Sequence, residues 1–260
     1  MTDMWFTVLG PVRFWRAGTE VDLGAPQQRT LLALLLVRAG HPVSLAEIVD
    51  VLWGGEPPRS AVNTVHRSIG MLRRALEPGL RARDTGRWLL RAAGGYRLDL
   101  DANSLDLLRF RLLLARARAA ADGPLAVRTF AQALELWQGP VASTVAPEVR
   151  GHPVFTAVDR LYEAAAREAA DAALAVGEPG ALMRAVEQAA GQAFLDESLQ
   201  ARLILMLAAT GRQAAALGRY ETVRARLTEE LGIDPGTELA GARDRVLRLV
   251  RPACRCLADR

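Results

Sequence analysis

Residues 60–76 decide how the rest of the chain is interpreted, and they read SAVNTVHRSIGMLRRAL. Their apolar members recur at helical spacing and predict one buried helix face, formed by Val62, Val65, Ile69, Leu72 and Leu76. The opposite face would collect Ser60, Asn63, Thr64, Arg67, Met71 and Arg74, with Gly70 beside them and with His66 and Arg73 nearer the apolar edge. Amides, hydroxyls and guanidinium groups are the donors that read base edges and hold phosphates in the DNA major groove. We therefore interpret the stretch as a DNA recognition helix; an ordinary amphipathic helix of a globular domain is the alternative.

Basic residues concentrate on this same segment. All 33 basic side chains of the 260-residue chain are arginines, a pattern that the codon usage of a GC-rich genome can produce by itself. From Arg59 to Arg97 the chain holds 9 arginines and 2 acids, a net charge of +7, whereas residues 99–260 hold 20 arginines and 21 acids. Such a local excess is typical of a surface that binds an anion.

The totals place the protein among ordinary globular chains of one or two domains. No purely apolar run is longer than the seven residues of 31–37, which is too short to cross a membrane, and no basic segment precedes an apolar core at the N-terminus. We expect a cytoplasmic protein with no membrane partner. Cys254 and Cys256 have no second Cys or His pair at metal-ligand spacing, so we expect reduced, solvent-facing thiols.

The segments before residue 60 predict a small sheet and two helices. Alternating aromatic and β-branched residues predict three short strands, at residues 5–9, 12–16 and 19–23. A leucine-rich run over residues 27–39 predicts a central core helix, and Ser44 with Glu47 matches a capping box that opens a second helix. Two short helices followed by a basic third helix are typical of a helix-turn-helix arrangement.

A β-hairpin is predicted directly after the basic helix. Residues 87–91 and 96–100 form its arms, and Gly94-Gly95 supplies the turn. A hairpin in this place is typical of the wing of a winged helix, and its glycines would let the backbone approach a phosphate. We expect phosphate contacts from Arg87, Arg91 or Arg97.

Strands disappear after residue 105, where Ala, Leu and Arg dominate. Gly and Pro signals separate seven predicted helices, near residues 104–121, 124–137, 154–176, 181–193, 197–210, 212–231 and 237–249. Paired helices of this length predict a tetratricopeptide-like array, of which residues 199–231 form the best repeat. Such an array usually offers a concave surface to proteins; a plain α-helical packing or dimerisation domain is the alternative.

Two groups of motifs resemble the Streptomyces antibiotic regulatory protein family. The N-terminal group consists of Leu9-Gly10-Pro11, Gln28-Arg29, Leu52-Trp53-Gly54, Pro57-Pro58, Leu72-Arg73-Arg74-Ala75-Leu76 and Gly95-Tyr96-Arg97-Leu98. The second group resembles that family's bacterial transcriptional activation domain and consists of Leu136-Trp137-Gln138-Gly139-Pro140, residues 211–217 (GRQAAAL) and residues 231–239 (LGIDPGTEL). The matches occur in the family's order over about residues 7–250.

The resemblance implies an α+β, OmpR-like winged helix at residues 1–100, an all-α tetratricopeptide-like activation domain at residues 101–252 and a tail at residues 253–260. The chain would then be mostly α-helical. The resemblance also implies a transcriptional activator of an antibiotic or other secondary-metabolite gene cluster. Its partners would be direct repeats in double-stranded promoter DNA, RNA polymerase holoenzyme, and a second copy of the chain on that DNA. No cofactor is implied, and no Gly-rich phosphate loop with a lysine occurs.

The predicted DNA contacts divide into base readers and phosphate holders. Base contacts are expected from Asn63, Thr64, Arg67 and Met71, with Ser60 at the helix start. Phosphate contacts are expected from Arg59, Arg73, Arg74, Arg87, Arg91 and Arg97. Gly70 and Met71 depart from the family pattern of a small polar residue followed by Arg or Asn, which indicates a changed base preference or weaker phosphate anchoring. The Gly/Pro-rich link at residues 177–180 is a further departure.

Other classes of function have less support in the sequence. The three histidines, His41, His66 and His152, lie in unrelated contexts, and no nucleophile or metal motif has a recognisable spacing, so we predict no enzyme. A tetratricopeptide-like scaffold would leave the +7 segment without a purpose. A DNA-binding repressor would bind DNA in the same way, and only the resemblance favours activation.

Overall fold

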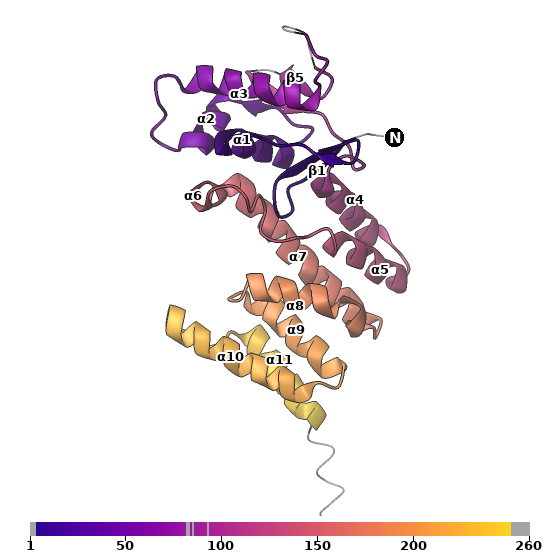
Figure 1. The fold of residues 1–260 in the computed structure, drawn as a ribbon. Coiled ribbons are helices and arrows are strands. Elements are labelled where there is room, and N and C mark those ends of the chain that lie inside the picture. The colour runs from indigo at the N-terminus through magenta and orange to yellow at the C-terminus, as the bar shows by residue number, and fades with distance from the viewer. Residues whose placement is uncertain (1–3, 82–83, 85, 93, 251–260) are drawn as a thin grey trace, which may run out of the picture. The chain divides into compact units, whose positions relative to one another are not determined.

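The computed structural model describes residues 4–81, 84, 86–92 and 94–250. The chain forms two compact units (Figure 1). One unit contains the chain up to residue 112 together with residues 136–160, and the other contains residues 113–135 and the chain from residue 161 onward. Cys254 and Cys256, expected to be reduced, solvent-facing thiols, lie outside the described residues.

A three-stranded antiparallel sheet opens the first unit. Its strands, in spatial order, are β1 (Met4–Thr7), β2 (Arg13–Arg16) and β3 (Thr19–Glu20). Phe6 and Phe14 are paired across the first two strands and stack with their ring centroids 4.5 Å apart. The third strand is shorter than predicted, because pairing stops at Glu20.

Three helices follow, as expected, in the order α1 (Pro26–Val37), α2 (Leu45–Trp53) and α3 (Ala61–Leu76). Every residue of α1 from Thr30 to Val37 is buried, which makes α1 the core helix of this unit. The Ser44 hydroxyl accepts a hydrogen bond from the amide of Glu47 at 3.1 Å and caps α2. The Glu47 carboxylate does not complete the predicted capping box, because it pairs with Arg38 at 2.8 Å.

A second sheet contains the predicted hairpin and one strand that was not predicted. The hairpin consists of β5 (Leu89–Ala92) and β6 (Gly95–Leu98), and β6 also pairs with the two-residue β4 (Val43–Ser44). Gly95 lies directly against β4, where an added Cβ atom would stand 1.9 Å from the Val43 carbonyl oxygen. Strand packing, and not approach to a phosphate, therefore requires a glycine at position 95. Gly94, at φ +70°, lies in the left-handed region that favours glycine.

A buried aspartate at the start of a later helix holds the backbone just after β1. Asp106, the first residue of α4 (Asp106–Ala119), is 2% exposed and accepts hydrogen bonds from the backbone amides of Val8, Leu9 and Leu107. Burial raises the pKa of this carboxyl group from 3.8 to about 6, while the amides of Leu9, Val8 and Leu107 act in the opposite direction. Residues 136–142 also contact this region, since the amides of Gln138 and Ala142 donate to the carbonyls of Leu9 and Val8.

The remaining elements are helical. They are α5 (Gly123–Leu134), α6 (Pro147–Arg150), α7 (Pro153–Ala175), the 3-10 helix η1 (Pro179–Leu182), α8 (Met183–Gln192), α9 (Glu197–Ala209), α10 (Gln213–Leu231) and α11 (Thr237–Val250). Within the second unit, α9 packs against α8, α10 and α11 (Figure 1). The prediction of a helical array is confirmed, with three local differences. The short α6 was not predicted, α5 ends earlier, and the predicted helix at 181–193 begins as η1 because Pro179 and Gly180 tighten its first turn.

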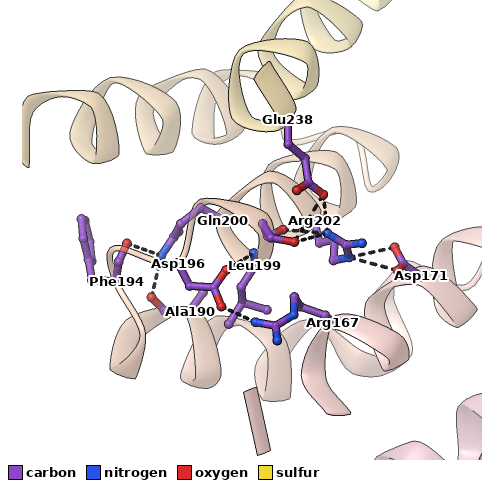
Figure 2. A network of polar contacts seen from close by, with 10 residues as sticks. Arg167, Asp171, Ala190, Phe194, Asp196, Leu199, Gln200, Arg202 and Glu238 are labelled. Atoms are coloured by element: carbon purple, nitrogen blue, oxygen red, sulfur yellow. Dashed lines mark hydrogen bonds and ion pairs between the residues drawn. The ribbon is translucent and has the colours of Figure 1, made fainter. Parts of the chain in front are cut away.

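Polar side chains connect the helices of this array around α9 (Figure 2). Gln200 is fully buried, and its amide donates to the carbonyls of Ala190 and Phe194 at 2.7 and 2.9 Å. Asp196 caps α9 by accepting from the amide of Leu199, and its other oxygen pairs with Arg167 of α7. These contacts satisfy buried polar groups while holding neighbouring helices in register.

Candidate DNA-binding surface

Helix α3 is anchored in the first unit through one face. Ala61, Val65, Ser68, Ile69, Leu72 and Leu76 are its buried residues. The opposite side exposes Val62, Asn63, His66, Arg67 and Arg74, and half-buries Thr64, Gly70, Met71 and Arg73. We call these nine residues the α3 strip. No acid occurs in α3, so the strip combines hydrogen-bond donors with positive charge.

The base-reading residues predicted from the sequence differ in how freely they are presented. Asn63 and Arg67 are exposed and lie one helical turn apart, so both can extend in the same direction. Ser60 and Arg59 are exposed just before the helix. Thr64 is half-buried, and its hydroxyl donates to the Ser60 carbonyl at 3.1 Å, so that hydroxyl has only its acceptor lone pairs left for a ligand.

Met71 lies at the edge of the strip. Its sulfur accepts a hydrogen bond from the side-chain amide of Gln28 in α1, at 2.9 Å, and the residue is half-buried. This hydrogen bond from Gln28 fixes the orientation of the Met71 side chain. A base contact by Met71 stays a prediction.

One residue of α3, Val62, is placed differently from the prediction, and His66 extends outward from its expected place near the apolar edge. Val62, expected on the buried face, is 45% exposed, and the small Ala61 is buried in its place. His66, expected near the apolar edge, is exposed, with its ring 6.4 Å from that of Tyr96. Relative to the predicted orientation, the helix is rotated about its axis. Its buried face is formed by Ala61, Val65, Ile69 and Leu72, and Val62 lies outside that face. Both residues therefore join the strip as candidate base contacts that the apolar pattern concealed.

Two of the arginines predicted to hold phosphates, Arg73 and Arg97, already form contacts within the protein. The Nε of Arg73 donates to the Leu89 carbonyl at 3.0 Å, and its guanidinium lies 5.9 Å from the centre of the Tyr96 ring. Arg97 is half-buried and pairs with Asp99 at 3.5 Å. The terminal N–H groups that these contacts leave free are the part of each side chain that a phosphate could reach, whereas the Nε of Arg97 is buried.

The other predicted phosphate holders are freer. Arg74, Arg87 and Arg91 are all exposed, and the Arg87 guanidinium lies 4.8 Å from the centre of the Trp88 ring. The nearby acid Glu77 accepts hydrogen bonds from the backbone amides of Arg87 and Trp88, so its charge is directed at the hairpin backbone. The α3 strip and the hairpin arginines thus present an excess of positive charge.

The comparisons with known proteins concern both parts of the chain. The family described as "Transcriptional regulatory protein, C terminal" matches residues 18–98, and the family described as "Bacterial transcriptional activator domain" matches residues 105–247. The chain belongs to the Streptomyces antibiotic regulatory protein family. The family's winged helix and helical array are both present in this structure.

Individual members of the family are similar over nearly the whole chain. The regulatory protein AfsR of Streptomyces coelicolor is 37% identical over 94% of this chain, and the transcriptional regulator RedD of the same species is 31% identical over 89%. A solved structure of Mycobacterium tuberculosis EmbR, in complex with a low-affinity phosphopeptide, superimposes with a TM-score of 0.76 at 33% identity and covers 96% of this chain. The chain spans 24% of the length of that AfsR, 67% of RedD and 66% of the EmbR chain. RedD and EmbR are transcriptional regulators by name, and AfsR is a regulatory protein by name.

Two features are absent from the described residues. No helix among them is long and apolar enough to span a membrane. No group of three or more His, Cys, Asp or Glu side chains among them is arranged to hold a metal ion.

Proposed function

We propose that this protein binds direct repeats in promoter DNA and activates transcription of a secondary-metabolite gene cluster by recruiting RNA polymerase. The observation that carries the DNA-binding part is the acid-free α3 strip, with Asn63 and Arg67 exposed one turn apart. An α-helix fits the major groove of B-form DNA, and these side-chain types form paired hydrogen bonds to adenine and guanine edges.

In this mode of binding, α3 enters the major groove. Asn63, Thr64 and Arg67 face the bases, with Val62 and Met71 available to thymine methyl groups. Arg59, Arg74, Arg87 and Arg91 hold the flanking phosphates, and Ser60 lies at the entrance of the helix. Arg73 and Arg97 contribute through the N–H groups that their contacts within the protein leave free.

We assign residues 1–100 to DNA recognition and residues 101–252 to contacts with proteins. Two copies would lie head-to-tail on repeats about one helical turn apart, as the family resemblance implies. The membership of AfsR and RedD in the family supports activation of an antibiotic cluster. A repressor would need the same DNA contacts and is the second candidate.

Binding and transcription are tested on the DNA immediately upstream of the biosynthetic genes next to this gene. Fluorescence anisotropy would compare that duplex with one in which a single repeat is scrambled, at two salt concentrations. Binding that weakens steeply with salt and that scrambling reduces supports a tandem-site reader. Transcription in vitro with RNA polymerase then separates the candidates, because an activator raises transcript yield and a repressor lowers it.

A further inference from the structure

An apolar pocket of about 440 Å³ lies in the second unit, between the ends of three helices. It is lined by Leu174 of α7, by Leu205, Ala208 and Ala209 of α9, and by Arg245, Arg248 and Leu249 of α11. We call it the α11 pocket. Leu249 at its edge is 61% exposed and extends the apolar lining to the surface.

The arginines of the array differ in whether their charge is already used. Arg202, which lines the adjoining pocket, pairs with Asp171 of α7 at 3.0 Å and with Glu238 of α11 at 2.6 Å (Figure 2). Arg245 and Arg248 are exposed, and neither forms an ion pair with a described residue. The α11 pocket therefore has an apolar floor and two arginines without an ion pair at its edge, which fits an apolar group flanked by acids.

A segment with that composition occurs in the same chain. Helix α10 ends at Leu231, and Gly232, in the left-handed region at φ +68°, turns the chain. Leu231 and Ile233 are 53% and 47% exposed. The acids Glu229 and Asp234 flank them and are exposed; neither forms an ion pair within 4 Å with a described residue, although Asp234 lies near enough to Arg224 to attract its charge. We call residues 229–234 the α10 knob.

We propose that the α10 knob of one copy occupies the α11 pocket of a second copy. Ile233 and Leu231 would cover the leucines and alanines of the pocket, and Glu229 and Asp234 would face Arg245 and Arg248. The knob and the pocket lie at opposite ends of α11, about 20 Å apart along its 14 residues. A molecule therefore cannot fill its own pocket through this contact, so the contact joins two copies. On direct repeats both copies face the same way, and the contact would then be made head-to-tail, with the knob of one copy in the pocket of the next.

This inference rests on the proposed binding to direct repeats, since head-to-tail sites and a head-to-tail interface have the same symmetry. The tail at residues 251–260 is a poor occupant by charge, because it holds three arginines and one aspartate. Two side chains in one pocket bury far less than the roughly 1,200 Å² of a stable interface. The contact is therefore expected only when DNA holds two copies side by side and raises their effective concentration.

Cysteine cross-linking on DNA tests the contact directly. In the 260-residue chain with Cys254→Ser and Cys256→Ser, Ile233→Cys is placed in one preparation and Leu249→Cys in another. The probe is a duplex that the protein itself selects from a random pool, with one or two copies of the site. Mixing the preparations on the two-site duplex should give an oxidised dimer at about ten times the yield on the one-site duplex. Each preparation alone should give almost none.

Controls separate this contact from random collision. Leu125→Cys provides a cysteine at a position as exposed as Ile233, 47%, and should not cross-link with Leu249→Cys. Adding Arg245→Glu and Arg248→Glu to the pocket partner should lower the yield about tenfold. Adding Glu229→Arg and Asp234→Arg to the knob partner should restore it.

Three results would overturn the inference: a mixture that cross-links no better than the Leu125→Cys control, strong self-cross-linking of Ile233→Cys, or insensitivity to the charge reversals. Affinity for the one-site duplex is measured on the same samples. Retained one-site binding without cross-linking refutes only this interface, whereas loss of DNA binding by the unmodified protein refutes the proposed function.

Discussion

Two glycines of the DNA-binding unit have opposite physical roles. Gly70 lies inside α3 with open space where a Cβ atom would be, and Gly95 lies against the Val43 carbonyl. Gly70→Ala should raise the free energy of unfolding by about 0.5–1 kcal/mol, because alanine is the better helix former. Gly95→Ala should lower it by at least about 2 kcal/mol, because β4 and β6 must separate. Urea denaturation of both variants checks this, and equal effects would contradict it.

The buried Asp106 predicts a pH dependence with a definite sign. Its pKa is raised from 3.8 to about 6 in the folded protein, so the unfolded chain releases this proton first as the pH rises. The protonated carboxyl group makes its full contribution to the free energy of unfolding below pH 4, and this contribution is lost as the pH rises towards 6. Relative to Asp106→Asn, which does not titrate, the wild type should lose up to about 3 kcal/mol between pH 4 and 6.5. A constant difference across that range, measured by urea denaturation, would show that the carboxyl group titrates normally.

At the scale of the elements, Arg202 joins three helices of the array. Its guanidinium contacts Asp171 of α7, Glu238 of α11 and the Ser198 carbonyl of its own helix. Arg202→Met keeps the aliphatic stem and removes the charge. We expect the free energy of unfolding to fall by about 1–2 kcal/mol. This loss is smaller than that expected for a fully buried ion pair, because Asp171 and Glu238 are more than half exposed and solvent screens their charges.

Arg212→Met is the matched control for this network. Arg212 forms one exposed ion pair, with Glu187 at 3.3 Å, and its removal should change the free energy of unfolding by less than about 0.5 kcal/mol. If both variants lost the same amount in urea denaturation, the three-helix contact of Arg202 would contribute nothing beyond an ordinary surface pair.

Elements with a long or capped sequence pattern could be predicted from the sequence, whereas short elements that depend on distant contacts could not. Helix α1 was predictable because its leucine-rich run is continuous, and the structure buries eight consecutive residues of it; α2 was predictable because Ser44 and Glu47 mark its start. The two-residue β4 was not, since it depends on contacts with β6, more than fifty residues later. Val62 was misplaced for a similar reason, because helical spacing alone gives two overlapping apolar faces and only packing selects one. The sequence also could not show that the Nε of Arg73 donates to the Leu89 carbonyl, because that hydrogen bond forms only in the folded protein.

At the scale of the whole molecule, the first compact unit is not contiguous in sequence. Backbone groups at Val8 and Leu9 bond to Asp106, Gln138 and Ala142, which lie after the hairpin. A chain cut after residue 98 lacks these partners and should lose at least about 3 kcal/mol of stability relative to a chain cut after residue 160. Urea denaturation of both fragments measures this, and equal stabilities would show that the contacts are dispensable.

The central claim is that the α3 strip reads DNA sequence, and one measurement tests it most directly. Fluorescence anisotropy gives the affinities of the wild type, Arg67→Ala and Arg74→Ala for the two-repeat duplex and for a random duplex, at two salt concentrations. Arg67→Ala should lose about 1–3 kcal/mol on the repeat duplex and little on random DNA, so its specificity ratio falls. Arg74→Ala should weaken binding to both duplexes alike and reduce the salt dependence by about one phosphate contact. Two variants that bind both duplexes as the wild type does would contradict the assignment of α3 as the recognition helix.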